Sequence, residues 1–110
     1  MKVKPWILSA LLFSSLMFAK TAEAKMSHGA VAYVPPSCDH FIMYSFTSYG
    51  YALLEWYGGN LPTEGENWIG NFESYGFHSL HWDDDEMRVY VEDYMMNADD
   101  AMEELWERCD

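Results

Sequence analysis

The sequence contains few basic residues. Six Lys and Arg stand against 18 Asp and Glu among 110 residues, and the formal net charge is −12. Most of the basic residues lie near the N-terminus, so the chain after residue 24 has three basic and 17 acidic residues and a formal charge of −14. This excess disfavours nucleic acid and anionic lipid as partners and favours basic proteins or metal cations. Acidity can also serve solubility alone.

The sequence also lacks an apolar run long enough to span a bilayer, which takes about 20 residues. Trp6–Ala19 is shorter, follows the basic residues Lys2 and Lys4, and precedes an Ala-Glu-Ala sequence that ends at Ala24. This arrangement is typical of a secretory signal peptide and predicts one over residues 1–24. We therefore expect a periplasmic or secreted protein that is not inserted in a membrane after cleavage.

Cysteine occurs only twice, as Cys38 and Cys109, and both follow the predicted signal peptide. Exported proteins meet an oxidising compartment, so we expect these residues to form one disulfide bond, with two free thiols as the alternative. The 86 residues after residue 24 suit one small domain, whose limited core gains from such a bond. A loop of this length predicts about 4 kcal/mol of stabilisation in the chain-entropy model.

Several sequence motifs of enzymes are missing. The chain has no GxSxG sequence, no P-loop and no glycine-rich dinucleotide fingerprint. If both cysteines form a disulfide, no thiol is free to act as a nucleophile. We therefore predict that the protein is not an enzyme.

Residues 84–109 carry the longest helical pattern in the chain. Counted from Met87, apolar residues recur at steps of 3, 4, 7, 8, 11, 15, 18, 19 and 22. This spacing is one face of an α-helix over about six turns, and the opposite face is acidic. Asn97 is a good N-cap residue and could interrupt the helix, but the unbroken apolar face predicts a kink at most.

A second helical pattern follows Ser37, a candidate N-cap, and continues to Trp56 before a pair of glycines. Several aromatic residues in this stretch suit a strand, so whether residues 41–57 are helix or strand stays open. A short third helix is expected over Trp68–Tyr75. The preceding Thr63–Glu66 segment matches a capping box.

These patterns predict an all-α fold. If the two long helices pack antiparallel, Cys38 at the start of one and Cys109 at the end of the other lie at the same end. We expect a small bundle of two long antiparallel helices and a short third helix, stapled by one disulfide bond, over residues 37–110. Residues 25–36 show no pattern and end in two prolines, which predicts an extended N-terminal arm.

One set of side chains could bind a metal ion. Histidines three residues apart share one face of a helix, and nearby carboxylates could complete a zinc site. The spacing matches neither an HExxH motif nor a calcium loop, and the acidic residues also suit the start of a helix. The set is His78, His81, Asp83 and Glu86. No cofactor is predicted.

A surface for a protein partner is the other candidate site. Sixteen of the 19 aromatic residues follow residue 24, which is a high load for a small core, so several should be exposed as in binding surfaces. Acidic residues also crowd the C-terminal half of the last predicted helix, where negative charge opposes the helix dipole. The expected partner-binding residues are Asp99, Asp100, Glu103, Glu104, Glu107, Trp68 and Trp82.

Two segments resemble those of small exported proteins. The sequence CDHFI at residues 38–42, together with AMEELWERC at residues 101–109, resembles the periplasmic immunity proteins of type VI secretion systems. That resemblance implies a helical, disulfide-containing protein that neutralises an effector. The same opening, with YMMNADDAMEEL at residues 94–105, is similar to the Hde acid-stress chaperones of the periplasm.

These observations lead to one main functional hypothesis and two alternatives. The main hypothesis is an exported, acidic, non-enzymatic binding protein that occludes a basic partner, such as a toxin or effector. The first alternative is a periplasmic acid-stress chaperone, whose many carboxylates would loosen the fold as the pH falls. The second is a periplasmic metal-binding protein. Homodimerisation through the aromatic residues stays open.

Overall fold

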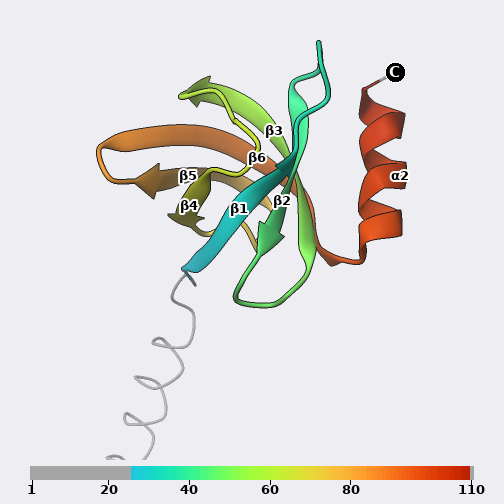
Figure 1. The fold of residues 1–110 in the computed structure, drawn as a ribbon, viewed down its shortest axis with the longest axis horizontal. Helices are drawn as coiled ribbons and strands as arrows, with labels where there is room; N and C mark the ends of the chain where they lie inside the picture. Colours follow the sequence, from blue (N-terminus) through green and yellow to red (C-terminus); the bar gives the residue numbers. More distant parts are fainter. Residues whose placement is uncertain (1–25, 110) are drawn as a thin grey trace, which may run out of the picture.

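The computed structural model describes residues 26–109, and these form a closed β-barrel with a helix on its outside (Figure 1). The signal peptide expected over residues 1–24 lies outside the described residues. Among the described residues, no helix combines the length and apolar character needed to cross a membrane. The elements are β1 Ser27–Tyr33, β2 His40–Ser45, β3 Tyr51–Gly59, β4 Asn67–Gly70, β5 Gly76–Trp82, β6 Asp85–Met96 and α2 Ala98–Arg108.

The six strands pair antiparallel around the barrel in the order β1-β2-β3-β6-β5-β4. The barrel closes because β1 pairs with β4 as well as with β2. The predicted all-α bundle is therefore wrong. Within the segment expected to form an extended arm, Ser27–Tyr33 is the strand β1 of the barrel.

β6 occupies the first half of the segment that was predicted as one long helix. Met87, Val89 and Val91 point into the barrel and are fully buried, and the residues between them lie on the outside. This alternation is the period of a strand. The outward positions include Tyr90, which has an aromatic ring. Tyr90 is three positions after the buried Met87, and this is also the spacing of neighbours on one face of a helix. The helical pattern therefore arose because both the inner and the outer face of this strand carry apolar side chains.

β2 and β3 misled the sequence prediction for a different reason. Phe41-Ile42-Met43 and Ala52-Leu53-Leu54 are buried runs in which every side chain is inaccessible to solvent. One face of each strand points into the barrel, and the middle residue of each run lies beneath α2. Strands buried on both faces have continuous apolar runs that lack the alternation of a half-buried strand. The strand alternative that stayed open for residues 41–57 is the correct one for most of that range.

The segment predicted to start the short third helix forms a turn. The Thr63 backbone N–H donates to Glu66 Oε1 at 3.1 Å, and the Glu66 backbone N–H donates to the Thr63 carbonyl oxygen at 3.1 Å. The first of these is the backward contact of a capping box, but the chain then enters β4 and forms no helix. A local capping contact alone does not start a helix, because further turns need packing to stabilise them.

α2 begins where the sequence placed only a kink. The Asn97 side chain accepts a hydrogen bond from the Asp100 backbone N–H at 2.8 Å and so caps the helix. At the other end, the Cys109 backbone N–H donates to the Leu105 carbonyl oxygen at 3.0 Å. Strand and helix thus meet at Asn97.

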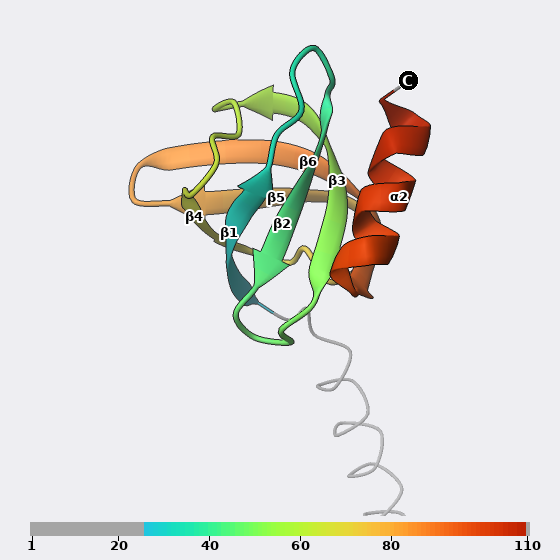
Figure 2. The same cartoon turned by 45° about the vertical axis from the view of Figure 1, so that its right-hand side comes forward.

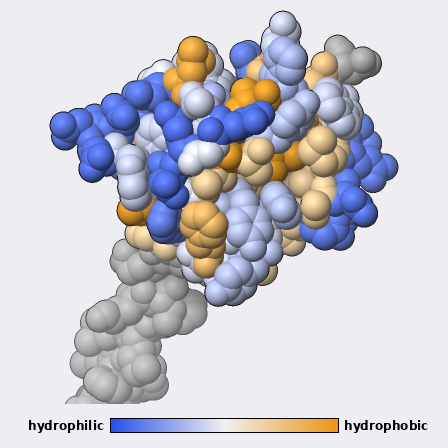
Figure 3. Space-filling model, viewed as in Figure 1, coloured by the Kyte–Doolittle hydropathy of each residue, from blue (hydrophilic) through white to orange (hydrophobic). Residues whose placement is uncertain are grey.

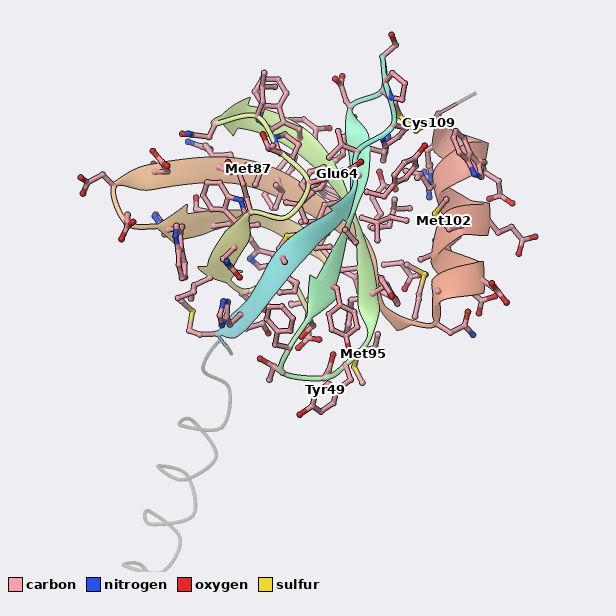
Figure 4. All side chains as sticks on the ribbon, viewed as in Figure 1. Tyr49, Glu64, Met87, Met95, Met102 and Cys109 are labelled. Carbon is pink, nitrogen blue, oxygen red and sulfur yellow. A yellow bond between two sulfur atoms is a disulfide. The ribbon has the colours of Figure 1, made fainter. Side chains whose placement is uncertain are left out.

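α2 packs along the outer face of β2 and β3 (Figure 2). Ala101 and Leu105 are buried against Ile42, Leu53 and Met96, which form a second apolar cluster separate from the barrel interior. Figure 4 shows Cys109 at the C-terminal end of the helix, where it forms a disulfide bond with Cys38 across a Cα–Cα distance of 5.5 Å. The predicted disulfide is therefore present, although it joins a helix to a loop before a strand.

Candidate functional site

One outer face of the barrel carries a row of four side chains that crosses four strands. In the register of the sheet, His40 of β2 lies opposite Glu55 of β3, and Glu55 lies opposite Tyr90 of β6. Tyr90 in turn lies opposite Phe77 of β5. Side chains directly opposite each other in neighbouring strands are in contact distance. The register therefore brings residues 37 positions apart in the sequence into one continuous surface.

The β5 end of this row is an aromatic patch, made of Tyr57, Phe77 and Tyr90. The Phe77 ring lies edge-on to both tyrosines, with ring centroids 4.9 Å from Tyr57 and 4.8 Å from Tyr90. Phe77 is 64% exposed and Tyr57 is 53% exposed. The patch borders a cleft of about 550 Å³, which Arg88 also lines. Large rings are thus held in fixed contacts while much of their surface faces solvent.

Carboxylates act on the aromatic patch and on the tyrosine that precedes β5. The negative charge of Glu55 raises the pKa of Tyr57, and that of Asp93 raises the pKa of Tyr75. The Tyr75 hydroxyl donates to Asp93 Oδ1 at 3.4 Å. Burial, followed by a hydrogen bond with Asp93 and its charge, raises the pKa of the Glu104 carboxyl on α2. Negative charge therefore extends from the patch to the edge of the helix.

The β2 end of the row is a polar group that we call the His40 cluster, made of His40, Glu55, Glu92 and Arg108. His40 Nε2 lies 2.7 Å from Glu92 Oε2 and 3.7 Å from Glu55 Oε1. The Arg108 guanidinium lies 2.9 Å from the other Glu92 oxygen, Oε1. Side chains from β2, β3, β6 and α2 thus converge at one point, close to the disulfide bond.

The His40 cluster contains a set of groups that could hold a metal ion. In the part of the chain that the structure describes, His40, Glu55 and Glu92 are the one set of three such residues whose potential ligand atoms all lie within 4.8 Å of one another. All three are half-buried. An imidazole and two carboxylates are a ligand type that zinc accepts.

The acidic residues predicted for partner binding lie on α2. Asp99, Asp100, Glu103 and Glu107 are exposed on the helix, whereas Glu104 is partly covered beside Asp93. Figure 3 shows hydrophilic residues over α2 at the right and over the β5–β6 hairpin at the left, with apolar surface between them. The helix therefore presents an acidic outer face.

The two predicted tryptophans have different positions. Trp82 is 37% exposed and stacks on the His28 ring at a centroid distance of 5.6 Å. Trp68 is 2% exposed and lies in the barrel interior. Trp68 is therefore a core residue with no surface to offer a partner, because its position in β4 points inward.

The predicted metal-binding set is not brought together. His78 and His81 are three residues apart in β5, and an odd spacing in a strand places side chains on opposite faces. His78 Nε2 lies 3.1 Å from the Ser74 carbonyl oxygen, whereas His81 is exposed and lies opposite Glu86 in the hairpin. Asp83 is in the turn of that hairpin with a positive φ of 54°. The assumed helical face does not exist.

Sequence reasoning missed the His40 cluster. The partners of His40 lie 15 and 52 positions further along the chain, so no local motif connects them. The available signal was the alternation in β6, where Arg88, Tyr90 and Glu92 fall between buried residues. Reading this alternation as a strand would have placed these three side chains on one outer face.

Comparisons with protein-family models, curated proteins and solved structures found no match to this chain.

Proposed function

We propose that this protein is an exported binding protein that holds a basic protein partner against the aromatic patch. One observation carries the proposal: Tyr57, Phe77 and Tyr90 form a contiguous surface, two of them are largely exposed, and carboxylates flank them. Aromatic side chains are enriched among the residues that dominate binding energy. Contacts among the three rings restrict their motion, so little side-chain entropy is lost on binding.

The charge of this surface supports a basic partner. The charge of Glu55 raises the pKa of Tyr57 in the patch, and the charge of Asp93 raises the pKa of Tyr75. Burial, followed by the hydrogen bond with Asp93 and its charge, raises the pKa of Glu104. Lysine or arginine side chains of a partner would relieve this repulsion and could also pack on the faces of the tyrosine rings. Electrostatic complementarity of this kind mainly accelerates association and selects the partner. Arg88, the arginine that lines the cleft, would donate hydrogen bonds to a carboxylate or carbonyl group of that partner.

The proposed class of partner rests on the segments that resemble immunity proteins, although the helical fold implied by that resemblance is not the fold of this chain. Residues 38–42 and 101–109 carry that resemblance, and the first of them starts at the disulfide and leads into the His40 cluster. The proposed partner is therefore a secreted basic effector or toxin, and the proposed role is to cover its active surface. This role requires no catalysis by the chain itself.

The proposal is tested by isolating bound proteins from periplasmic and secreted fractions and then measuring the affinity of each purified candidate by calorimetry. We expect a 1:1 complex with a basic protein. Replacing Phe77 with Ala should weaken it about 30-fold or more, as for a residue at the centre of an interface. Affinity should also fall as the salt concentration rises.

A matched control is available at the other end of the barrel. Tyr49 is 75% exposed and lies at the lower end of the view in Figure 4, near Met95. Tyr49→Ala removes a similar area of exposed aromatic surface and should leave the affinity unchanged. Equal losses for Phe77→Ala and Tyr49→Ala, or binding that does not depend on Phe77, would contradict the proposed surface.

A further inference from the structure

We propose that His40, Glu55 and Glu92 form a binding site for a divalent transition-metal ion, with zinc as the best fit. The three side chains come from β2, β3 and β6, so they do not depend on a flexible loop for their placement. His40 and Glu55 are direct partners in the register of the sheet. The site shares Glu55 with the carboxylates beside the aromatic patch, whereas its other two ligands do not belong to that patch.

The two distances from the His40 nitrogen to the glutamate oxygens lie on either side of the separation that zinc requires. Zinc bonds of about 2.0–2.2 Å in a tetrahedral arrangement place neighbouring ligand atoms about 3.3–3.5 Å apart. His40 Nε2 is 3.7 Å from Glu55 Oε1 and 2.7 Å from Glu92 Oε2. Small rotations of the two glutamate side chains would therefore complete the ligand set without a change in the backbone.

The arrangement of hydrogen-bonding groups also favours a cation between these side chains. Two carboxylates approach the same nitrogen, His40 Nε2, which can carry only one hydrogen. That hydrogen can serve Glu92 at 2.7 Å, but Glu55 at 3.7 Å is then beyond hydrogen-bond distance. A divalent ion would instead contact both carboxylates together with the lone pair of the imidazole.

Arg108 has a position that supports this reading. It binds Glu92 Oε1 at 2.9 Å and leaves Oε2 turned towards His40. Groups that hold a metal-binding carboxylate in its orientation are a regular part of metal sites. Arg108 also offsets one of the two negative charges when no ion is bound, which would allow the three ligands to remain close together.

The site is open on one side. A cleft of about 260 Å³ is bordered by His40, Glu55 and Arg108 together with the disulfide and its neighbours Ser37 and Asp39. This space would admit an ion and leave room for water to complete its coordination. Three protein ligands with an open position are typical of zinc sites that also contact a further molecule.

The test is a titration of the purified, disulfide-bonded protein with ZnCl₂ by calorimetry and with CoCl₂ by visible absorption. We expect one bound ion per chain and a cobalt spectrum typical of four-coordinate binding. His40→Ala should abolish both signals. Glu55→Gln should weaken binding by roughly 10- to 100-fold.

His81→Ala is the matched control, since His81 is an exposed histidine of the same barrel that lies outside the cluster. It should bind zinc as tightly as the unaltered protein. Near-ultraviolet circular dichroism in the presence of a chelator checks that each variant folds. If His40→Ala does not fold, the result for Glu55→Gln decides the test, because the Glu55 side chain is 29% exposed and is the most accessible of the three ligands. No 1:1 binding, or equal binding by Glu55→Gln, overturns the proposal.

Discussion

The barrel interior and the interface between α2 and the barrel are both apolar, but they are built differently. The interior draws buried side chains from all six strands and from Phe72 in the loop after β4. The interface draws on Ala101 and Leu105 of the helix and on three side chains from the outer face of the barrel. The interior is enclosed by the closed sheet. The interface depends on a short helix that a disulfide bond holds at its C-terminal end. We infer that α2 can loosen without loss of the barrel.

Phe72→Ala should have the largest effect, because it damages the interior. Its ring is fully buried and lies close to Gly29, where any side chain would collide with this ring and with the Tyr44 carbonyl oxygen. Phenylalanine-to-alanine changes in a core cost roughly 4–5 kcal/mol when the cavity cannot collapse. Denaturant unfolding followed by circular dichroism should show one cooperative transition at lower stability. Loss of helix signal alone would contradict the closed interior.

Replacing Cys38 and Cys109 with serine should have the next largest effect. The disulfide closes a loop across a sequence separation of 71 and ties the end of α2 to the start of β2. The chain-entropy model predicts a loss of roughly 3–4 kcal/mol in unfolding free energy. Hydrogen exchange should report faster exchange in α2 than in the strands of the interior. Uniform loss of protection would show that helix and barrel unfold as one unit.

Leu105→Ala tests the interface without touching the disulfide. Leu105 is fully buried against the outer face of the barrel. A loss of roughly 2–3 kcal/mol is expected, at the lower end for a buried leucine, because the helix can shift to fill part of the cavity. Hydrogen exchange should accelerate in α2 while the amides of β6 next to the interior stay protected. Trp106→Ala is the control, since Trp106 is 50% exposed on the same turn of the helix.

Glu104→Gln should have the smallest effect and one that depends on pH. Burial, followed by the hydrogen bond with Asp93 and its charge, raises the pKa of Glu104 above its ordinary value of 4.5. The folded protein therefore binds this proton more tightly than the unfolded chain, and ionisation above the raised pKa destabilises the fold. Glu104→Gln should raise the melting temperature at neutral pH, and the gain should disappear as the pH falls towards 4.5.

Glu103→Gln is the matched control for this pH dependence. Glu103 precedes Glu104 on α2 and is exposed. Its substitution should not produce a gain that disappears between neutral pH and pH 4.5. If both variants behave alike, the effect belongs to the overall negative charge of the chain and not to the contact between α2 and β6.

The sequence predicted some local features and failed on the overall class of the fold. The capping role of Asn97 was recognised, yet the helical spacing before it was given more weight. Met87 on the buried face of β6 and Tyr90 on its outer face are three positions apart, so the strand has the apolar spacing of a helix. Fully buried runs in β2 and β3 gave no alternation to correct the error.

The candidate site could be predicted only in part, because some of its features are local in the sequence and others depend on strand pairing. Exposed aromatic residues were expected in general, but the contact between Tyr57 and Phe77 depends on the register between β3, β6 and β5. His40 and Glu92 are 52 positions apart, and nothing in their local sequences connects them. Acidic residues on α2 needed only a local helix, which is why that part of the surface was found.

The sequence by itself determined the pairing of the cysteines, since only two exist, and the acidity of the exposed helix face. It also contained the cap at Asn97, which is made by residues three positions apart, although the predicted helix continued through that position. Only the tertiary structure decided that the segments before it are strands, that they close a barrel, and that His40, Glu55 and Glu92 meet. Pairing between distant strands depends on which faces become buried, and burial is a property of the whole fold.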